Sequence, residues 1–468
     1  MGSNWATVSI DDIKSPEKYS CVGGPFGSSL SQKHYVDSGV PVIRGTNLTG
    51  DIFSESGFVF VSPDKANELQ RNMAFRGDIV FTQRGTLGQV ALIPEDSIYE
   101  RYIVSQSQMK LTVNPKKADA YFIYTYFRTN EAKALIVNNA IVGGVPHINL
   151  GILKEFKLRL PPLSEQKRIS EVSKSIDNKI NINHQINQTL EQMSQTLFKS
   201  WFVDFDPVID NALDAGTPIP EALQSRAELR QKVRISADFK PLPADIRALF
   251  PAEFEETELG WVPKGWMLES VAKSININPS VKLPQNTIAK YVDMKSLPTQ
   301  GYSISEVIEK PYAGGAKFQK NDTLFARITP CLENGKTGFV DFLDEKETAF
   351  GSTEFIVMRG TTKVHYSYVA CLARENNFRL HAIQNMVGSS GRQRVQNSCF
   401  DSFYIAIPTT SIMSLFSGKV SSYFEKMYSC NLENKSLTAL RDTLLPKLIS
   451  GELSLEDLPD LANQTEPA

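Results

Sequence analysis

The sequence has few cysteines and histidines, and it lacks a long run of apolar residues. Its five cysteines are far apart and odd in number, which fits neither a metal-binding CxxC pair nor a disulfide framework. The five histidines show no paired spacing, so we expect no metal site. A stretch of about 18 apolar residues and a signal-peptide pattern are both missing, so we expect a cytoplasmic protein without a membrane segment.

The sequence also lacks an excess of basic residues. Its formal net charge is −2, which argues against a chain that grips nucleic acid by charge alone. Two stretches, residues 101–118 and 376–400, nevertheless contain lysines or arginines and no acidic residue. One such stretch can arise by chance, whereas two favour local anion-binding faces.

Motifs of enzymes that act on DNA are missing as well. An adenine methyltransferase must hold a flipped base, and the phrase closest to the required Asn/Asp-Pro-Pro-aromatic motif is Leu-Pro-Pro-Leu at residues 160–163. Gly335-Lys336-Thr337 is similar to the end of a phosphate-binding loop, but Pro330 stands where the first glycine belongs. No short phrase clusters carboxylates as a nuclease requires. We therefore expect a non-catalytic chain without a cofactor of its own. The alternative is a methyltransferase or nuclease with an unrecognised motif.

An internal repeat is the most informative feature that is present. Both halves contain, in the same order, a Trp with an alternating segment, an aromatic–turn–strand phrase, a Gly-bounded strand, a Tyr-rich helical segment, a Gly-rich loop and a strand running into proline. In the first half these occupy residues 5–10, 75–81, 88–93, 121–136, 142–147 and 156–161. In the second they occupy residues 264–271, 318–325, 338–340, 366–383, 387–392 and 403–408. The order predicts two copies of one module.

A long amphipathic helix is predicted after the last strand of each copy. Heptad spacing marks a seam, on which Asn183 could fix the register as a buried polar residue. The seam residues are Ile169, Val172, Ile176, Asn183, Ile186, Leu190, Met193 and Leu197 in the first helix, and Leu437, Leu440 and Leu444 in the second. A core-facing helix would show a similar stripe, but about 35 residues is long for one. The pattern therefore favours a mutual coiled coil about 50 Å long. Pro446 should bend or end the second helix near its last turn.

Together these patterns predict an α+β protein with a pseudo-twofold arrangement. Two β-rich globular domains are each followed by a long helix, and the two helices pair as an antiparallel coiled coil. We expect a first domain at residues 1–160, its helix at 161–204, a Pro-rich linker with one helix at 205–262, a second domain at 263–408, its helix at 409–450, and a flexible tail at 451–468.

Several loops carry side chains suited to DNA. Arg and Lys can bond guanine, Asn and Gln can bond adenine, and Ser, Thr and Gly-rich backbone suit phosphates. The candidate DNA-contacting residues are Arg44, Thr46, Asn47, Gln83, Arg84, Arg327, Thr329, Lys336, Ser389, Ser390, Arg392, Gln393 and Arg394. Each could equally be an ordinary solvated loop residue. Arg392 to Arg394, in the acid-free Gly/Ser loop, are the strongest candidates.

Three phrases resemble a known family. Residues 160–169, Leu-Pro-Pro-Leu-Ser-Glu-Gln-Lys-Arg-Ile, resemble the junction in type I restriction-modification specificity subunits where a target-recognition domain ends and a conserved spacer helix begins. Residues 190–205 and 259–266 are similar to the same family. The resemblance covers nearly the whole chain. The second copy departs from it, since Pro408-Thr-Thr-Ser411 replaces the Pro-Pro-Leu-Ser-Glu-Gln phrase, which leaves open how equivalently the two junctions dock partners.

The resemblance implies a DNA-binding subunit of a bacterial defence system. Each domain would read one half of an interrupted, asymmetric site in double-stranded DNA, and the two helices would set the gap between the halves. Two methyltransferase subunits would supply S-adenosylmethionine chemistry, and motor-nuclease subunits would supply ATP- and Mg-dependent cleavage. A specificity subunit of a methylation-only system and a coiled-coil scaffold that binds no DNA are the alternatives.

Overall fold

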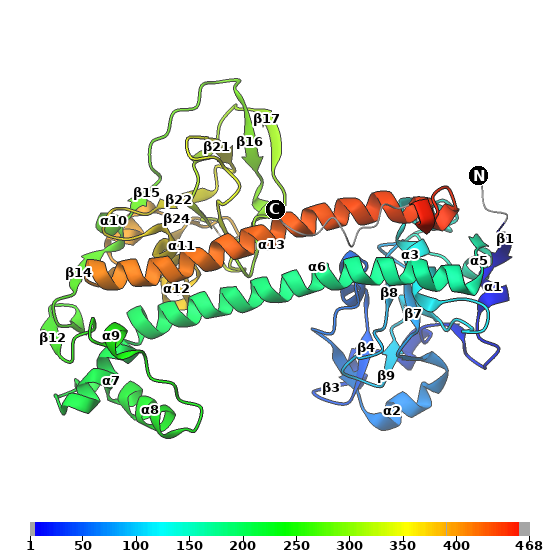
Figure 1. Ribbon diagram of the computed structural model, residues 1–468, viewed down its shortest axis with the longest axis horizontal. Coiled ribbons are helices and arrows are strands. Elements are labelled where there is room, and N and C mark those ends of the chain that lie inside the picture. Colours follow the sequence, from blue (N-terminus) through cyan, green and yellow to red (C-terminus); the bar gives the residue numbers. More distant parts are fainter. Residues whose placement is uncertain (1–4, 390, 458–468) are drawn as a thin grey trace. The chain divides into compact units, whose positions relative to one another are not determined.

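The computed structural model describes residues 5–389 and 391–457, which form two compact units. Unit 1 consists of Met1–Asn181 and Asn434–Ala468, and unit 2 consists of Ile182–Glu433. Two long helices, α6 (Leu163–Phe198) and α13 (Thr410–Ser450), contribute residues to both units (Figure 1). The fold class is α+β, as the sequence predicts. Among the described residues, no helix is both long and apolar enough to cross a membrane.

Unit 1 is built around two sheets. The first has the strand order β2-β10-β7-β8 and is antiparallel. The second has the order β3-β5-β4-β9-β6, and its strands β4 and β9 run parallel. A further antiparallel pair, β1 with β11, joins the start of the module to its end. The strands are β1 (Ala6–Ser9), β2 (Cys21–Gly23), β3 (Tyr35–Val36), β4 (Val40–Ile43), β5 (Val59–Val61), β6 (Met73–Phe75), β7 (Ile79–Thr82), β8 (Val90–Leu92), β9 (Arg101–Val104), β10 (Gln108–Leu111) and β11 (Lys157–Leu160).

Helices cover the first sheet of unit 1 and complete its core. The aspartate at the N-cap of α3, Asp119, accepts a hydrogen bond of 2.9 Å from the backbone N–H of Phe122, which satisfies one of the free donors at the helix start. Phe122 and Phe127 of α3 are fully buried in the same core as Phe81 of β7. The helices that cover this sheet are α1 (Ile10–Ile13), α3 (Ala120–Arg128), α4 (Asn130–Asn138) and α5 (Leu150–Glu155). Helix α2 (Pro63–Glu68) packs against the second sheet instead, since Ala66 shares a core with Val42 and Ile103.

Unit 2 repeats this topology. Its first sheet has the order β15-β22-β19-β20, and its second has the order β17-β16-β21-β18 with β16 parallel to β21. The pair β14 with β25 corresponds to β1 with β11. The strands are β14 (Met267–Ser270), β15 (Asn276–Ile277), β16 (Ile288–Val292), β17 (Ile308–Pro311), β18 (Ala316–Phe318), β19 (Thr323–Ala326), β20 (Thr337–Phe339), β21 (Ala349–Gly351), β22 (Phe355–Arg359), β23 (Met386–Val387), β24 (Arg394–Val395) and β25 (Tyr404–Ile407). The helices α10 (Val271–Ser274), α11 (Tyr366–Arg374) and α12 (Asn376–Gln384) correspond to α1, α3 and α4. The sheet topology confirms the internal repeat.

Both modules also place a buried aspartate before the central strand of the first sheet. Asp78 accepts hydrogen bonds from the backbone of Phe75 and from Lys110, each at 2.9 Å. Asp322 accepts one from the backbone of Gln319 at 2.7 Å and two from Arg359 at 2.6 and 2.7 Å. A buried carboxylate is costly unless it is paired. Each module therefore pairs its aspartate with a basic side chain, although the two basic residues stand at different positions of the module.

Side-chain contacts join α6 and α13 within each unit. In unit 1, Ile169 packs in the same core as Leu444 and Leu448, and Asn434 donates a hydrogen bond of 3.4 Å to the backbone carbonyl of Ile180. In unit 2, Asn183 donates to Glu433 and Asn187 donates to Asn431, both at 2.8 Å. In each unit, residues later in α6 contact residues earlier in α13.

The predicted seam needs a correction. Met193 and Leu440 are 44% and 41% exposed, so neither lies in the contact face. The buried positions are Ile169, Ile176, Ile180, Asn183, Asn187, Ser173, Ser194 and Leu444, while Val172, Ile186, Leu190, Leu197 and Leu437 are half-buried. The contact face of α6 contains small or amide side chains at three heptad positions, each next to an apolar residue. A prediction based on hydrophobicity chooses the apolar residue beside each of these small or amide residues. At those three positions the predicted seam is therefore one residue away from the buried position.

Pro446 lies at the last turn of α13, which ends at Ser450, close to where the sequence predicts the end of the helix. The expectation for the linker was wrong. Residues 205–262, expected to be a linker with one helix, contain α7 (Asp206–Ala215), α8 (Gln224–Ile235), α9 (Ala244–Arg247) and the strand pair β12 (Phe254–Thr257) and β13 (Gly260–Pro263). Of the predicted flexible tail, residues 458–468 lie outside the described residues.

A ladder of ion pairs fastens α7 to α8. Aspartates at four-residue spacing on α7 face arginines at the same spacing on α8, because four residues are about one helical turn. The pairs are Asp206 with Arg226, Asp210 with Arg230 and Asp214 with Arg234. The first two are bidentate, with distances of 2.7 to 2.9 Å. This ladder explains how a Pro-rich, largely polar segment folds.

Candidate nucleic-acid interface

In unit 1, three loops meet where the central strand β7 ends. The backbone N–H groups of Gln83 and Arg84, which follow β7, donate to the carbonyl of Ser107 at 2.8 and 3.2 Å. The N–H of Gly24, which follows β2, donates to the carbonyl of Gln108 at 2.8 Å. The loops at residues 24–29, 83–86 and 105–107 therefore form one continuous edge.

The loop after β4 adjoins this edge, because the N–H of Ser105 donates to the carbonyl of Ile43 at 2.9 Å. Two predicted contact residues of this loop are held by the protein itself. The Arg44 guanidinium donates to the carbonyl of Gly57 at 2.7 Å. The Asn47 side chain is fully buried and donates to two backbone carbonyls, both at 3.0 Å. We correct the prediction for Asn47, since its amide stabilises the loop from inside. Thr46 is exposed.

A short hairpin completes the edge in unit 1. Ile141 and His147 pair with each other, and His147 also pairs with Arg84. Ile148 donates to the carbonyl of Gln83 at 3.0 Å. The tip of this hairpin, residues 142–146, exposes Val142 by 83% and Val145 by 58%. Sequence reasoning recognised this loop as part of the repeat but did not select its valines, because apolar side chains are not a typical signal for DNA contact.

Unit 2 has the equivalent hairpin, β23 with β24, beside the end of β19. The N–H of Val395 donates to the carbonyl of Arg327 at 2.8 Å, and the Arg327 guanidinium donates to the carbonyl of Val395 at 2.9 Å. Thr329 and Gln393 exchange two hydrogen bonds of 3.1 Å. Arg327 and Thr329 therefore hold the hairpin against the strand end, and Thr329 is only 9% exposed.

The tip of the second hairpin carries the strongest predicted contacts. Arg392 and Ser389 are exposed, and Gln393 is half-buried. Ser390 lies outside the described residues. Arg394 is held by Glu354, with Nε and Nη2 at 2.7 to 3.0 Å from the carboxylate oxygens. This ion pair raises the pKa of Arg394. Glu354 is a functional candidate that the sequence did not indicate, because it lies 40 residues from its partner.

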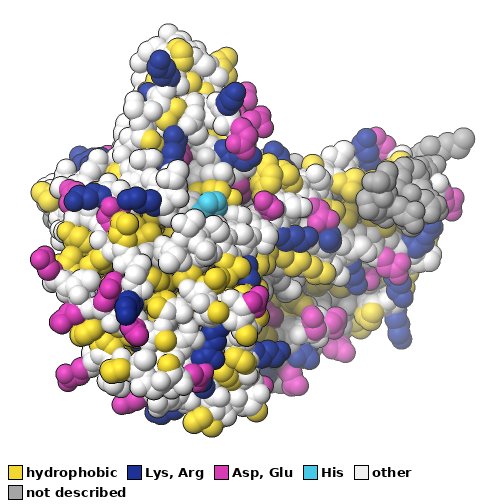
Figure 2. Space-filling model, turned by 60° about the vertical axis from the view of Figure 1, so that its left-hand side comes forward, with side chains coloured by type: hydrophobic (Ala, Val, Ile, Leu, Met, Phe, Trp, Pro, Cys, Tyr) yellow, Lys and Arg dark blue, Asp and Glu magenta, His cyan; other side chains and the backbone are white. Residues whose placement is uncertain are grey.

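Lys336 does not face solvent as a phosphate contact would. Its ammonium donates to the backbone carbonyls of Met294 and Lys295 at 2.8 and 3.3 Å. The lysine therefore ties the turn after β19 to residues 294–296, which corrects the prediction of a phosphate contact there. On the face of unit 2 seen in Figure 2, basic and acidic side chains are interspersed, in agreement with the low net charge of the chain.

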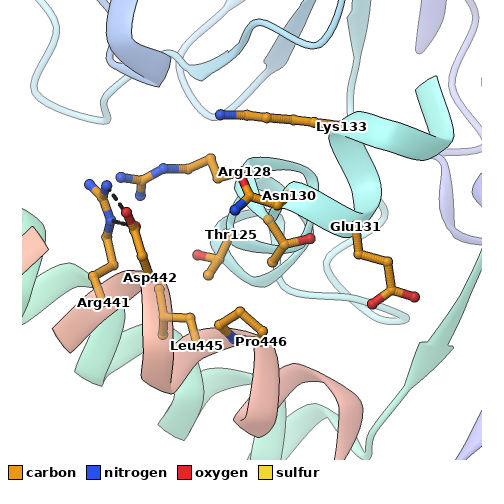
Figure 3. A pocket seen from close by; sticks show the side chains of 10 residues that line it. Thr125, Arg128, Asn130, Glu131, Lys133, Arg441, Asp442, Leu445 and Pro446 are labelled. Carbon is orange, nitrogen blue, oxygen red and sulfur yellow. Dashed lines mark hydrogen bonds and ion pairs between the residues drawn. The ribbon is translucent and has the colours of Figure 1, made fainter. Parts of the chain in front are cut away.

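A pocket of about 190 Å³ lies in unit 1 between α13 and the junction of α3 with α4 (Figure 3). Arg128, Lys133 and Arg441 line it, and the guanidinium groups of Arg128 and Arg441 face carboxylates. Arg128 donates two hydrogen bonds, of 2.5 and 2.9 Å, to Asp177. Burial would raise the pKa of Asp177, but the bonds from Arg128 bring it below its usual value. The dashed lines in Figure 3 join Arg441 to Asp442. The pocket is a structural ion-pair cluster rather than an anion site. Among residues 5–389 and 391–457, no cluster of His, Cys, Asp and Glu suited to a metal occurs.

Comparisons with known proteins show what this chain is similar to. The family model described as "Type I restriction modification DNA specificity domain" matches residues 3–192. The chain is 25% identical over 433 residues to the type I restriction enzyme HindI specificity subunit of Haemophilus influenzae, covering 86% of this chain and 93% of that protein. It is 24% identical over 462 residues to the MjaIX specificity subunit of Methanocaldococcus jannaschii, covering 96% and 94%.

A solved structure shares the fold of this chain. The S subunit of a type I restriction-modification system from M. genitalium has a TM-score of 0.52 at 14% identity, and the match covers 95% of this chain and 96% of that one. Residues 3–192 therefore match the DNA specificity domain of this family, and nearly the whole chain is similar to type I restriction enzyme specificity subunits.

Proposed function

We propose that this chain reads a bipartite, asymmetric site in double-stranded DNA, with one half-site for each unit. The observation that carries the proposal is the repeated edge. The first sheets of the two units have the same strand order, and the second sheets match except for β3, which has no counterpart in unit 2. Both units place a hairpin and polar loops at the end of the same central strand. Side chains on such an edge can reach base edges, while backbone and hydroxyl groups can hold phosphates. Because the two edges differ in sequence, the two half-sites differ as well.

We further propose that α6 and α13 pair along their length as an antiparallel coiled coil, relating the modules by a pseudo-twofold axis. The contacts between the helices within each unit support this pairing. At about 1.5 Å per residue, the 36 residues of α6 give a rod that sets the gap between the half-sites, as dimer geometry sets operator spacing.

The chain itself performs no chemistry in this proposal. Two methyltransferase subunits dock around the helices and supply S-adenosylmethionine-dependent adenine methylation, and motor-nuclease subunits bring ATP and Mg. The near-neutral charge and mixed surface (Figure 2) fit a subunit that grips DNA only with its partners, since phosphate contacts by Lys and Arg dominate affinity. A subunit that serves a methylation-only system would look the same, and only the presence of a motor-nuclease partner separates the two.

Selection from a random DNA pool tests the proposal. The chain bound to its proposed methyltransferase partner should enrich one split motif, and the methyltransferase alone should enrich none. A complex that enriches no motif would contradict sequence recognition. If the isolated chain bound the motif as tightly as the complex does, the proposal that tight DNA binding requires the partners would fail. The proposal that the chain recognises the sequence would stand.

A further inference from the structure

The two hairpin tips are equivalent in position but opposite in chemistry. Both stand beside the end of the central strand of the first sheet, one next to Arg84 and the other next to Ile328. The tip in unit 2 is Gly-Ser-Ser-Gly-Arg-Gln, whereas the tip in unit 1, residues 142–146, is Val-Gly-Gly-Val-Pro. An arginine tip suits guanine, which offers two acceptors in the major groove. A valine tip has no hydrogen-bonding side chain and needs an apolar partner.

The valine side chains of this tip also pack little against the rest of unit 1. Val142 is 83% exposed and Val145 is 58% exposed. A methyl group added at Gly143 or Gly144 would meet no atom within 4 Å. Gly144 has a φ of +117°, which glycine adopts without strain. The tip is therefore a narrow projection with its apolar side chains facing outward, and it does not serve the core.

We propose that Val142 and Val145 read a thymine in the half-site of unit 1 by contact with its C5-methyl group. This inference rests on the proposed function. In the major groove the methyl group is the apolar feature that distinguishes thymine, and the groove is wide enough for a two-stranded ribbon. Both Gly143 and Gly144 lack side chains, so the backbone can approach the bases closely.

Two observations favour DNA over a protein partner as the occupant of this tip. First, the equivalent tip in unit 2 carries Arg392 and Ser389, both exposed, which suit a nucleic acid. Second, the base of the valine hairpin joins the edge that carries Gln83 and the exposed Arg84, so the apolar tip is bordered by side chains that can bond bases or phosphates.

Deoxyuridine scanning of the recognised site tests the inference, because uracil differs from thymine only by the missing methyl group. Once the motif is known, each thymine of each half is replaced in turn, and binding of the complex is measured. We expect one replacement, in the half not affected by Arg392→Ala, to weaken binding about fourfold, the factor expected for one buried methyl group. The double variant Val142→Ala/Val145→Ala should bind both DNAs equally. Val137→Ala, at an exposed valine of α4, should retain the wild-type response.

Other outcomes overturn the inference. Equal sensitivity of the wild type and the double variant would mean that the valines do not contact the methyl group, as would a half-site whose thymines can all be replaced without loss. A double variant that no longer assembles with the methyltransferase would assign the tip to a protein contact. The failure of the proposed function is a separate result, since in that case the wild-type complex has no motif to scan.

Discussion

At the scale of single residues, the structure divides the predicted contacts into those that face solvent and those that position others. Arg392 is exposed at the hairpin tip, whereas Arg394 is held by the carboxylate of Glu354. Asn47 and Lys336 bond the backbone. Sequence patterns could indicate which loops carry polar side chains. They could not indicate which side chains the protein uses internally, because partners such as Glu354 are distant in the chain.

The first prediction concerns Arg392. Arg392→Ala should relax specificity at one position of one half-site by about tenfold or more, because a bidentate contact with guanine discriminates by about 1–3 kcal/mol. Binding of the assembled complex to single-base variants of its motif measures this. Lys346→Ala, which removes another exposed cation of unit 2, should leave the specificity unchanged. An equal loss for every base variant would show that Arg392 contacts the phosphate backbone instead.

The second prediction concerns Asp341, where burial raises the pKa to about 6. Because the folded state binds this proton more tightly than the unfolded state, the contribution of Asp341 to stability is full below about pH 4 and is lost as the pH rises toward 6. Asp341→Asn should therefore raise the free energy of unfolding by about 2 kcal/mol at pH 7.5 and leave it nearly unchanged at pH 4. Urea unfolding followed by tryptophan fluorescence reports on unit 2, which contains Trp201, Trp261 and Trp266.

The matched control for this variant is Asp344→Asn, at an exposed carboxylate nearby. It should change stability by less than about 0.5 kcal/mol at either pH. A gain for Asp341→Asn that is the same at pH 4 and pH 7.5 would contradict an electrostatic origin.

At the scale of elements, the long helices were predictable and their contact face was not. The heptad pattern predicts helices near residues 161–204 and 409–450, and the structure has α6 and α13 there. The face differs by one position at Ser173, Asn187 and Ser194, because packing selects small or hydrogen-bonded side chains that a hydrophobic pattern ignores. Helix α7 was missed for a related reason. It is stabilised by its buried Val208 and Ile209 and by ion pairs with α8, and the pairing of its aspartates with arginines of another helix is not visible in a hydrophobic pattern.

The third prediction tests this register. Ile180→Ala should lower the free energy of unfolding of unit 1 by about 2–4 kcal/mol, because the isoleucine is 6% exposed and its loss leaves a cavity. Leu440→Ala should cost less than about 1 kcal/mol, since Leu440 is 41% exposed. Denaturation followed by circular dichroism measures both. Equal losses of unfolding free energy for the two variants would contradict this register and favour the seam that hydrophobicity predicts.

At the scale of the whole molecule, the repeat is the property that the sequence reveals most clearly. Six recurring elements predict two copies of one module, and the two units have matching strand orders except for β3, which only unit 1 contains. The order of elements survives low identity, since each element has its own pattern of turns, aromatics and glycines. The asymmetry between the copies, such as Lys110 in one and Arg359 in the other as partner of the buried aspartate, becomes visible only in three dimensions.

The fourth prediction concerns the proposal that the length of α6 and α13 sets the gap between the two half-sites. The boundary between the units falls after Asn181 in α6 and after Glu433 in α13. Inserting seven residues at each point adds about 10 Å of helix while nearly preserving the contact face. The gap between the two half-sites should lengthen by about three base pairs at 3.4 Å each, as measured by selection from random DNA. A motif with the original gap would contradict the proposal that the helix length sets the gap.

The central claim is that this chain supplies the DNA sequence specificity of a methylating complex. Single-molecule sequencing of adenine methylation tests it most directly, in a host that carries the gene with that of the proposed methyltransferase partner and in the same host without the gene. The account predicts a split, asymmetric motif with a methylated adenine in each half, which disappears when the gene is deleted. An unchanged methylation pattern in an active system would contradict it.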